Sequence, residues 1–118
     1  MRSVLVMCLA ILAGTLVRQP ALAATACDRE CLRGRITEVL YALVEHDTAK
    51  LPVASLLRVT EDGVEKPLAQ VGLVRSVTKL AGHRQDIIDE RTGQAVAGVM
   101  VEESGAPVIL ALRVRLDG

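Results

Sequence analysis

Residues 92–116, TGQAVAGVMVEESGAPVILALRVRL, decide the fold class of this chain. In the final stretch, VILALRVRL, every second residue is a large aliphatic one, whereas Arg113 and Arg115 fall on the opposite side. Such alternation predicts an antiparallel strand with one buried face. Ser104 to Pro107 carry turn-forming residues, so the apolar segment before them, residues 94–103, is predicted to be a second strand.

Short extended segments separated by turns continue upstream of this pair. HRQDIIDE, residues 83–90, is predicted to be a strand that ends at a turn over residues 91–93. Further back, Glu61-Asp62-Gly63 indicates a tight hairpin between two short extended runs. Residues 69–82 are ambiguous and indicate a short helix or an irregular connection, because valines recur there at helical spacing (Val71, Val74, Val77).

The segment from Asp28 to Asp47 has the pattern of an amphipathic helix. Apolar residues recur every three or four positions and form one stripe: Leu32, Ile36, Val39, Leu40, Leu43 and Val44. His46 and Asp47 close this helix, and Pro52 then enforces a break. A helix followed by a meander of strands predicts an α+β fold, in which the helix covers one face of an antiparallel sheet.

Cys27 and Cys31 stand at the start of this helix. If Asp28 is the N-cap, Cys27 lies outside the helix and Cys31 is its third residue, so a disulfide between them is little strained. We predict this disulfide and no metal site, because His46 and His83 lack the spacing of zinc ligands. The three intervening residues also exclude a C-x-x-C redox motif. Two free thiols, or a lipid on Cys27, remain alternatives.

Residues 1–23, MRSVLVMCLAILAGTLVRQPALA, have the three regions of a secretory signal peptide, with cleavage expected after Ala23. Their apolar run is shorter than the ~20 residues that a membrane-spanning helix needs, so a permanent anchor is the weaker interpretation, as is a buried core helix. We therefore expect residues 24–118 to form a single domain that is secreted or periplasmic, without a stable membrane span. An oxidising compartment also favours the disulfide.

Composition excludes several classes of function. The first 23 residues hold two of the 14 basic residues and no acid, so the rest of the chain carries a net charge of −2. With no basic stripe and Tyr41 as the one aromatic residue, nucleic acid is not an expected partner. No phosphate-binding glycine loop and no nucleophile elbow occur, and no cofactor is expected.

Several strings resemble a secreted family of unassigned function from fungi and bacteria: CDRECL, ALVEHD, TEDGVEKPL and residues 92–116. That family is similar to the nuclear transport factor 2-like superfamily, whose relatives include ketosteroid isomerase, scytalone dehydratase and polyketide cyclases. The resemblance covers residues 27–116. It implies a cone-shaped fold, in which an N-terminal helix packs on a curved antiparallel sheet.

The resemblance also implies two classes of function. The first is a module that binds a small apolar molecule, forms a homodimer through the outer face of its sheet, or does both. The alternative is an isomerase, dehydratase or cyclase that uses acid and base groups inside the cone. Tyr41, His83, Asp86 and Asp89 are the candidate catalytic residues. Strand alternation places Asp86 on the face opposite Asp89, so the four need not converge.

The sequence ends RVRLDG, on a dipeptide that favours hairpin turns, with no strand after it. Relatives continue with a further strand. The resemblance therefore implies a domain truncated at its C-terminus, which lacks its last strand and exposes a sheet edge.

Overall fold

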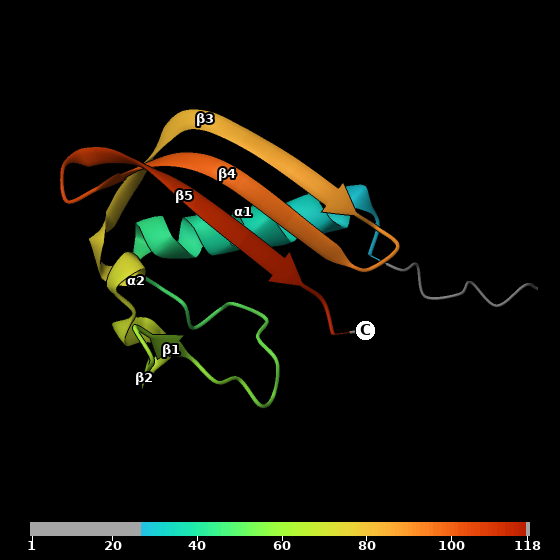
Figure 1. The fold of residues 1–118 in the computed structure, drawn as a ribbon, viewed down its shortest axis with the longest axis horizontal. Helices are drawn as coiled ribbons and strands as arrows, with labels where there is room; N and C mark the ends of the chain where they lie inside the picture. Colours follow the sequence, from blue (N-terminus) through green and yellow to red (C-terminus); the bar gives the residue numbers. More distant parts are fainter. Residues whose placement is uncertain (1–26, 118) are drawn as a thin grey trace, which may run out of the picture.

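A three-stranded antiparallel sheet, covered on one face by a long helix, forms the body of the protein in the computed structural model, which describes residues 27–117 (Figure 1). The predicted α+β class is confirmed. The predicted signal peptide and its cleavage site after Ala23 lie outside the described residues. In chain order the elements are α1 (Arg29–Glu45), β1 (Thr60–Glu61), β2 (Val64–Glu65), the 3₁₀ helix η1 (Leu68–Gln70), α2 (Gly72–Ser76), β3 (Val77–Asp89), β4 (Gln94–Glu103) and β5 (Ala106–Arg115).

Helix α1 begins and ends as its sequence predicts. Asp28 is the N-cap, and its Oδ1 accepts a hydrogen bond of 2.9 Å from the main-chain N–H of Cys31. Residues of the predicted stripe face the sheet and are buried: Leu32, Ile36, Leu40 and Leu43. His46 stops the helix in a left-handed conformation, with φ 56°. Its Nδ1 lies 2.6 Å from the carbonyl oxygen of Val74, which ties the end of α1 to α2.

The sheet order is β3-β4-β5, so β4 is its centre. The side chains of β4 that face α1 are all buried, and two of them are alanines, which let the helix approach closely: Ala95, Ala97, Val99 and Val101. Helix α1 contacts β3 more extensively than it contacts β4 or β5. The inner face of β5 is therefore the least covered part of the sheet.

Strand β3 is longer than predicted. The sequence indicated a strand over residues 83–90, but β3 already begins at Val77, and the short helix expected before it is confined to Gly72–Ser76. Two register shifts, between Val77 and Lys79 and between Leu80 and Arg84, interrupt its pairing with β4. Such bulges break the period-two alternation, which is why the sequence pattern did not reveal this half of the strand.

Two hairpins turn on residue pairs in which both members have positive φ. Asp62 and Gly63 join β1 to β2, as predicted. Ser104 and Gly105 join β4 to β5. The turn predicted over residues 104–107 is thus too long by two residues, because Ala106 already pairs with Glu103 in the sheet.

Candidate ligand-binding groove

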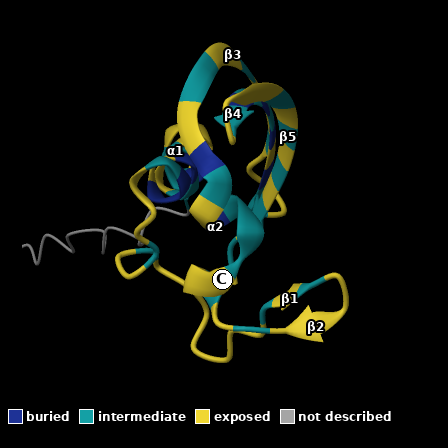
Figure 2. Ribbon diagram, turned by 90° about the vertical axis from the view of Figure 1, so that its left-hand side faces the viewer, coloured by how far each residue is buried: buried dark blue, intermediate teal, exposed yellow. Residues whose placement is uncertain are grey.

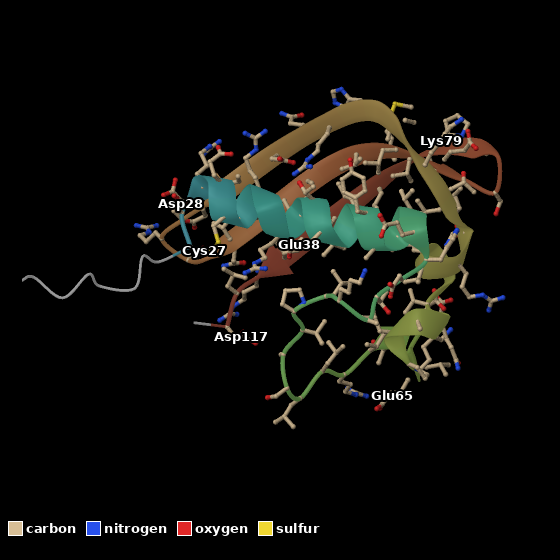
Figure 3. All side chains as sticks on the ribbon, turned by 180° about the vertical axis from the view of Figure 1, so that it is seen from behind. Cys27, Asp28, Glu38, Glu65, Lys79 and Asp117 are labelled. Atoms are coloured by element: carbon tan, nitrogen blue, oxygen red, sulfur yellow. A yellow bond between two sulfur atoms is a disulfide. The ribbon has the colours of Figure 1, made fainter. Side chains whose placement is uncertain are left out.

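A groove of about 580 Å³ lies between α1, the loop that follows it and the edge strand β5. Figure 3 labels two acids of its lining, Glu38 on α1 and Asp117 just past β5. The groove exists because α1 lies nearest to β3 and leaves the inner side of β5 partly uncovered. Its lining comprises Arg35, Glu38 and Val39 of α1, Leu51–Ala54 and Leu57 of the loop, Leu68 of η1, and residues 112–117.

Most of this lining is aliphatic. Along β5, the inward side chains of Leu112 and Val114 are half-buried, whereas Arg113 and Arg115 on the other face are exposed. Figure 2 shows these two levels of exposure alternating along the strand, which confirms the alternation predicted from the sequence. The loop residues Leu51–Ala54 and Leu57 add an apolar and largely exposed opposite wall. The groove therefore offers apolar surface that the protein itself does not bury.

The charged residues of the lining are mostly exposed. Arg35 and Glu38, one turn apart on α1, form an ion pair with Nη1 and Oε2 2.9 Å apart. Arg113 donates from Nε to the side-chain oxygen of Gln94 at 3.1 Å. Asp117 follows the strand. No ion pair among the described residues involves Arg115.

The main chain of β5 forms the remaining wall. Leu116 donates its N–H to the carbonyl oxygen of Gly93, on the β4 side, at 2.9 Å. Since successive residues of a strand direct their main-chain groups to opposite sides, Arg113 and Arg115 direct theirs away from β4. Within residues 27–117, β5 has β4 as its one neighbour in the sheet. Their N–H and C=O groups therefore form an open edge beside the apolar groove.

None of the four candidate catalytic residues lines the groove. Tyr41 is 53% exposed on α1. His83 and Asp89 are exposed on β3, and Asp86 faces α1 from the same strand. The structure therefore brings none of these side chains together with another around a common cavity.

Asp86 belongs instead to a charged cluster that joins β3 to α1. Its carboxylate accepts a hydrogen bond of 2.8 Å from Nε of Arg84 and one of 3.4 Å from Nε of Arg33. Arg84 also donates to the hydroxyl of Thr37 at 2.9 Å. The hydrogen bond from Arg84, followed by the charges of both arginines, holds the pKa of Asp86 below its ordinary value. This arrangement stabilises a carboxylate and connects two elements.

Asp89 has a local role. Its side chain accepts a 2.7 Å hydrogen bond from the Thr92 hydroxyl and further bonds from the main-chain N–H groups of Arg91 and Thr92. These bonds, with that from the Thr92 hydroxyl foremost, lower the pKa of Asp89. Asp89 therefore shapes the turn between β3 and β4, as Asx turns commonly do.

Cys27 and Cys31 form the predicted disulfide, with their sulfur atoms 1.94 Å apart. Cys27 lies before the N-cap and Cys31 is the third residue of α1, the arrangement that the sequence suggested. No group of three or more metal-ligating side chains occurs within residues 27–117. Across the same residues, no helix is both long and apolar enough to cross a bilayer.

One polar site was not expected from the sequence. Oε1 of Glu61 accepts a 2.7 Å hydrogen bond from the main-chain N–H of Gly72, and its other oxygen contacts the ammonium group of Lys66. The Lys66 contact, then the Gly72 bond, lower the pKa of Glu61. A Cβ atom at Gly72 would lie 2.9 Å from Oε1, so a larger residue would displace this carboxylate. Glu61 thereby anchors the β1–β2 hairpin to α2.

Comparisons with protein-family models, with curated proteins and with solved structures found no match for this chain. Membership of the nuclear transport factor 2-like superfamily, inferred from the quoted strings, therefore stays a prediction. The case for a function depends on the geometry of the groove.

Proposed function

We propose that this protein is a secreted or periplasmic module of the nuclear transport factor 2-like type that binds a small apolar molecule in the groove between α1 and β5. The observation that carries the proposal is the aliphatic lining of a groove of about 580 Å³. Ligand sites of this size are commonly apolar with a few polar groups at their margins. The helix on an antiparallel sheet is compatible with the cone fold, and the disulfide supports an oxidising compartment.

The enzyme alternative has less support. A proton-transfer site requires titratable groups that face the substrate, and Tyr41, His83, Asp86 and Asp89 all lie outside the groove. The acids that do line it are Glu38, which is paired with Arg35, and Asp117.

Titration with Nile red, a neutral apolar dye, tests the proposal. We expect saturable fluorescence, and we expect Val39→Glu to weaken binding at least about tenfold, because it places a charge against the apolar lining. The matched control is Val64→Glu, on the exposed hairpin strand β2 and outside the lining. Absence of saturable binding, or equal affinity in both variants with native circular dichroism, would contradict the proposal.

A second candidate function, self-association through the outer face of the sheet, is favoured by the side chains on that face. Ile87 is 67% exposed and Ile109 is 80% exposed. The register places Val96 beside Ile87, and Met100 beside Ile109, on the neighbouring strands. These four residues form two apolar pairs, separated by Gly98 on β4, on the face that α1 does not cover.

Sedimentation velocity over a range of protein concentrations tests this homodimer. We expect a concentration-dependent dimer that Ile109→Lys dissociates, whereas Leu56→Lys, in the exposed loop, leaves it intact. A chain that stays monomeric throughout would argue against the sheet-face dimer and leave ligand binding unaffected.

A further inference from the structure

The loop between α1 and β1 exposes aliphatic side chains to solvent. In Figure 1 it is the green segment that extends below α1 and the sheet. Leu56 is 93% exposed, the highest fraction of any large hydrophobic side chain in the described part of the chain. Val53 and Leu57 are about half exposed. An aliphatic segment that the protein itself does not cover indicates an interaction surface.

The exposure of this loop is separate from the groove beside β5. Val53 and Leu57 contribute to the groove lining, whereas Leu56 does not. The loop therefore presents Leu56 on a side other than the one that faces β5. What occupies the groove does not decide whether Leu56 is accessible.

Two cations bracket the aliphatic part of the loop. Lys50 and Arg58 are exposed, and the seven residues between them, LPVASLL, carry no charge. No ion pair within residues 27–117 involves Lys50. Arg58 lies 3.3 Å from a carboxylate oxygen of Glu65, but both side chains are mostly exposed, so water screens this pair. Both positive charges therefore stay available to a negatively charged surface.

The acids on either side of the loop lie outside it and have local partners. Asp47 accepts a 2.9 Å hydrogen bond from the main-chain N–H of Ala49, in the turn after α1. Glu61 contacts Lys66 and the main-chain N–H of Gly72. Residues 48–60 thus contain two positive charges and no negative one.

An aliphatic tip between two cations matches the surface of a phospholipid bilayer. Aliphatic side chains gain free energy by entering the acyl region, while lysine and arginine stay at the level of the anionic headgroups. The residues that dominate binding between proteins are instead enriched in tryptophan, tyrosine and arginine, and leucine is under-represented among them. The loop contains no aromatic residue, so a lipid surface fits it better than a protein pocket does.

We propose that residues 50–58 bind the surface of a membrane that contains anionic phospholipids, with Leu56 inserted among the acyl chains and Lys50 and Arg58 at the headgroups. This inference goes beyond the proposed function, because membrane binding requires neither the groove nor its ligand. A few aliphatic side chains do not anchor a protein permanently. Binding is therefore reversible and becomes weaker at high salt.

The first test is sedimentation with vesicles of phosphatidylcholine and phosphatidylglycerol in equal amounts. It uses the processed, disulfide-bonded protein, because the apolar segment in residues 1–23 would itself bind lipid. Leu56→Asp should weaken binding at least about tenfold, since a carboxylate stays out of the acyl region. Ile87→Asp, at an exposed aliphatic residue of β3, is the matched control. No binding of the unmodified protein, or equal loss in both variants with native circular dichroism, would overturn the proposal.

The second test removes the two cations. Lys50→Gln combined with Arg58→Gln should weaken binding to these vesicles at least about fivefold, and should leave the weaker binding to pure phosphatidylcholine unchanged. Arg29→Gln combined with Arg91→Gln removes the same charge from exposed positions outside the loop and is the control. Equal effects of the two double variants would indicate attraction to the protein as a whole and would overturn the proposal.

The third test observes insertion directly, because the sequence contains no tryptophan. The emission of Leu56→Trp should shift to shorter wavelength when vesicles are added, and phosphatidylcholine brominated on its acyl chains should quench it. Ile87→Trp should show neither effect. An unshifted and unquenched signal from Leu56→Trp would overturn the proposal, even if the protein sediments with vesicles.

The outcomes separate this inference from the proposed function. Leu56→Asp should retain saturable Nile red binding, measured without vesicles, since Leu56 does not line the groove. If Nile red binds but vesicles do not, the membrane proposal fails and the groove stands. If vesicles bind but Nile red does not, the groove proposal fails and the membrane site stands.

Discussion

Replacing Asp86 with asparagine should destabilise the fold by about 2 kcal/mol at neutral pH. The Asp86 side chain is 8% exposed, and Nε of Arg84 lies 2.8 Å from its carboxylate. A hydrogen bond that involves a charged group contributes about 1.5–3 kcal/mol. Arg33 is 51% exposed and 3.4 Å away, so its contribution is screened and falls below about 1 kcal/mol.

The expected loss of stability lies in the lower part of the range of about 1.5–3 kcal/mol, because Arg84 keeps other hydrogen-bond partners. In the variant its guanidinium still donates to the Thr37 hydroxyl and to the main-chain oxygen of Arg33. The arginine is therefore not left without hydrogen bonds, which would cost more. Urea denaturation followed by circular dichroism gives the free energy of unfolding for both proteins. Glu90→Gln, an exposed acid in the turn after β3, is the control.

The stability difference between the unmodified protein and the Asp86→Asn variant should depend on pH. The pKa of Asp86 in the folded protein lies below the ordinary value of 3.8, chiefly through the hydrogen bond from Arg84. The stabilisation is then fully present above the unfolded-state pKa and is lost as the pH falls through the folded-state pKa. The difference in free energy of unfolding between the two proteins should therefore become smaller in acid. A difference below about 0.5 kcal/mol at neutral pH, within the range of ordinary surface substitutions, would refute the reasoning, as would one that stays constant in acid.

Three further substitutions test the framework of the fold, each by the free energy of unfolding in urea. Replacing Cys27 and Cys31 together with serine should cost about 2 kcal/mol, because the closed loop is short, and a reducing agent should have no further effect on the variant. Ile36→Ala should cost about 2–5 kcal/mol, since this side chain is fully buried between α1 and the sheet. Ser104→Asn should stabilise by about 0.5 kcal/mol, because asparagine tolerates the positive φ of this turn position better.

The fold was predictable wherever one regular period governs a segment. The stripe of α1, its N-cap at Asp28 and the alternation of β5 all gave elements that the structure contains. The strand over residues 77–82 could not be predicted, because two bulges in β3 interrupt the alternation of its side chains. Apart from Gly82, which has a positive φ, no residue in this segment indicates a bulge. The register of a bulged strand depends on the strand beside it, so the local sequence does not predict it.

The candidate site was less predictable than the fold. The four candidate catalytic residues were chosen because their side chains can exchange protons, and they lie outside the groove. The type of a residue does not indicate which cavity its side chain faces. The groove residues Leu51–Ala54 and Leu57 belong to a loop whose apolar composition was the available signal. An exposed sheet edge was already an expectation from the resemblance, whereas its place at Arg113 and Arg115 follows from the order of the described strands, which the alternation of a single strand cannot supply.

Pro107 limits what can happen along the exposed border of β5. It occupies the second position of that strand and, by the same alternation, turns its ring nitrogen toward the open side, where it has no hydrogen to donate. A strand at this border can therefore form both main-chain hydrogen bonds at Ile109, Ala111, Arg113 and Arg115, whereas Pro107 offers its carbonyl oxygen alone. On the opposite border of the sheet, the bulges of β3 disturb a regular template. Among the described residues, each border of the sheet thus carries a feature that hinders regular edge-to-edge pairing.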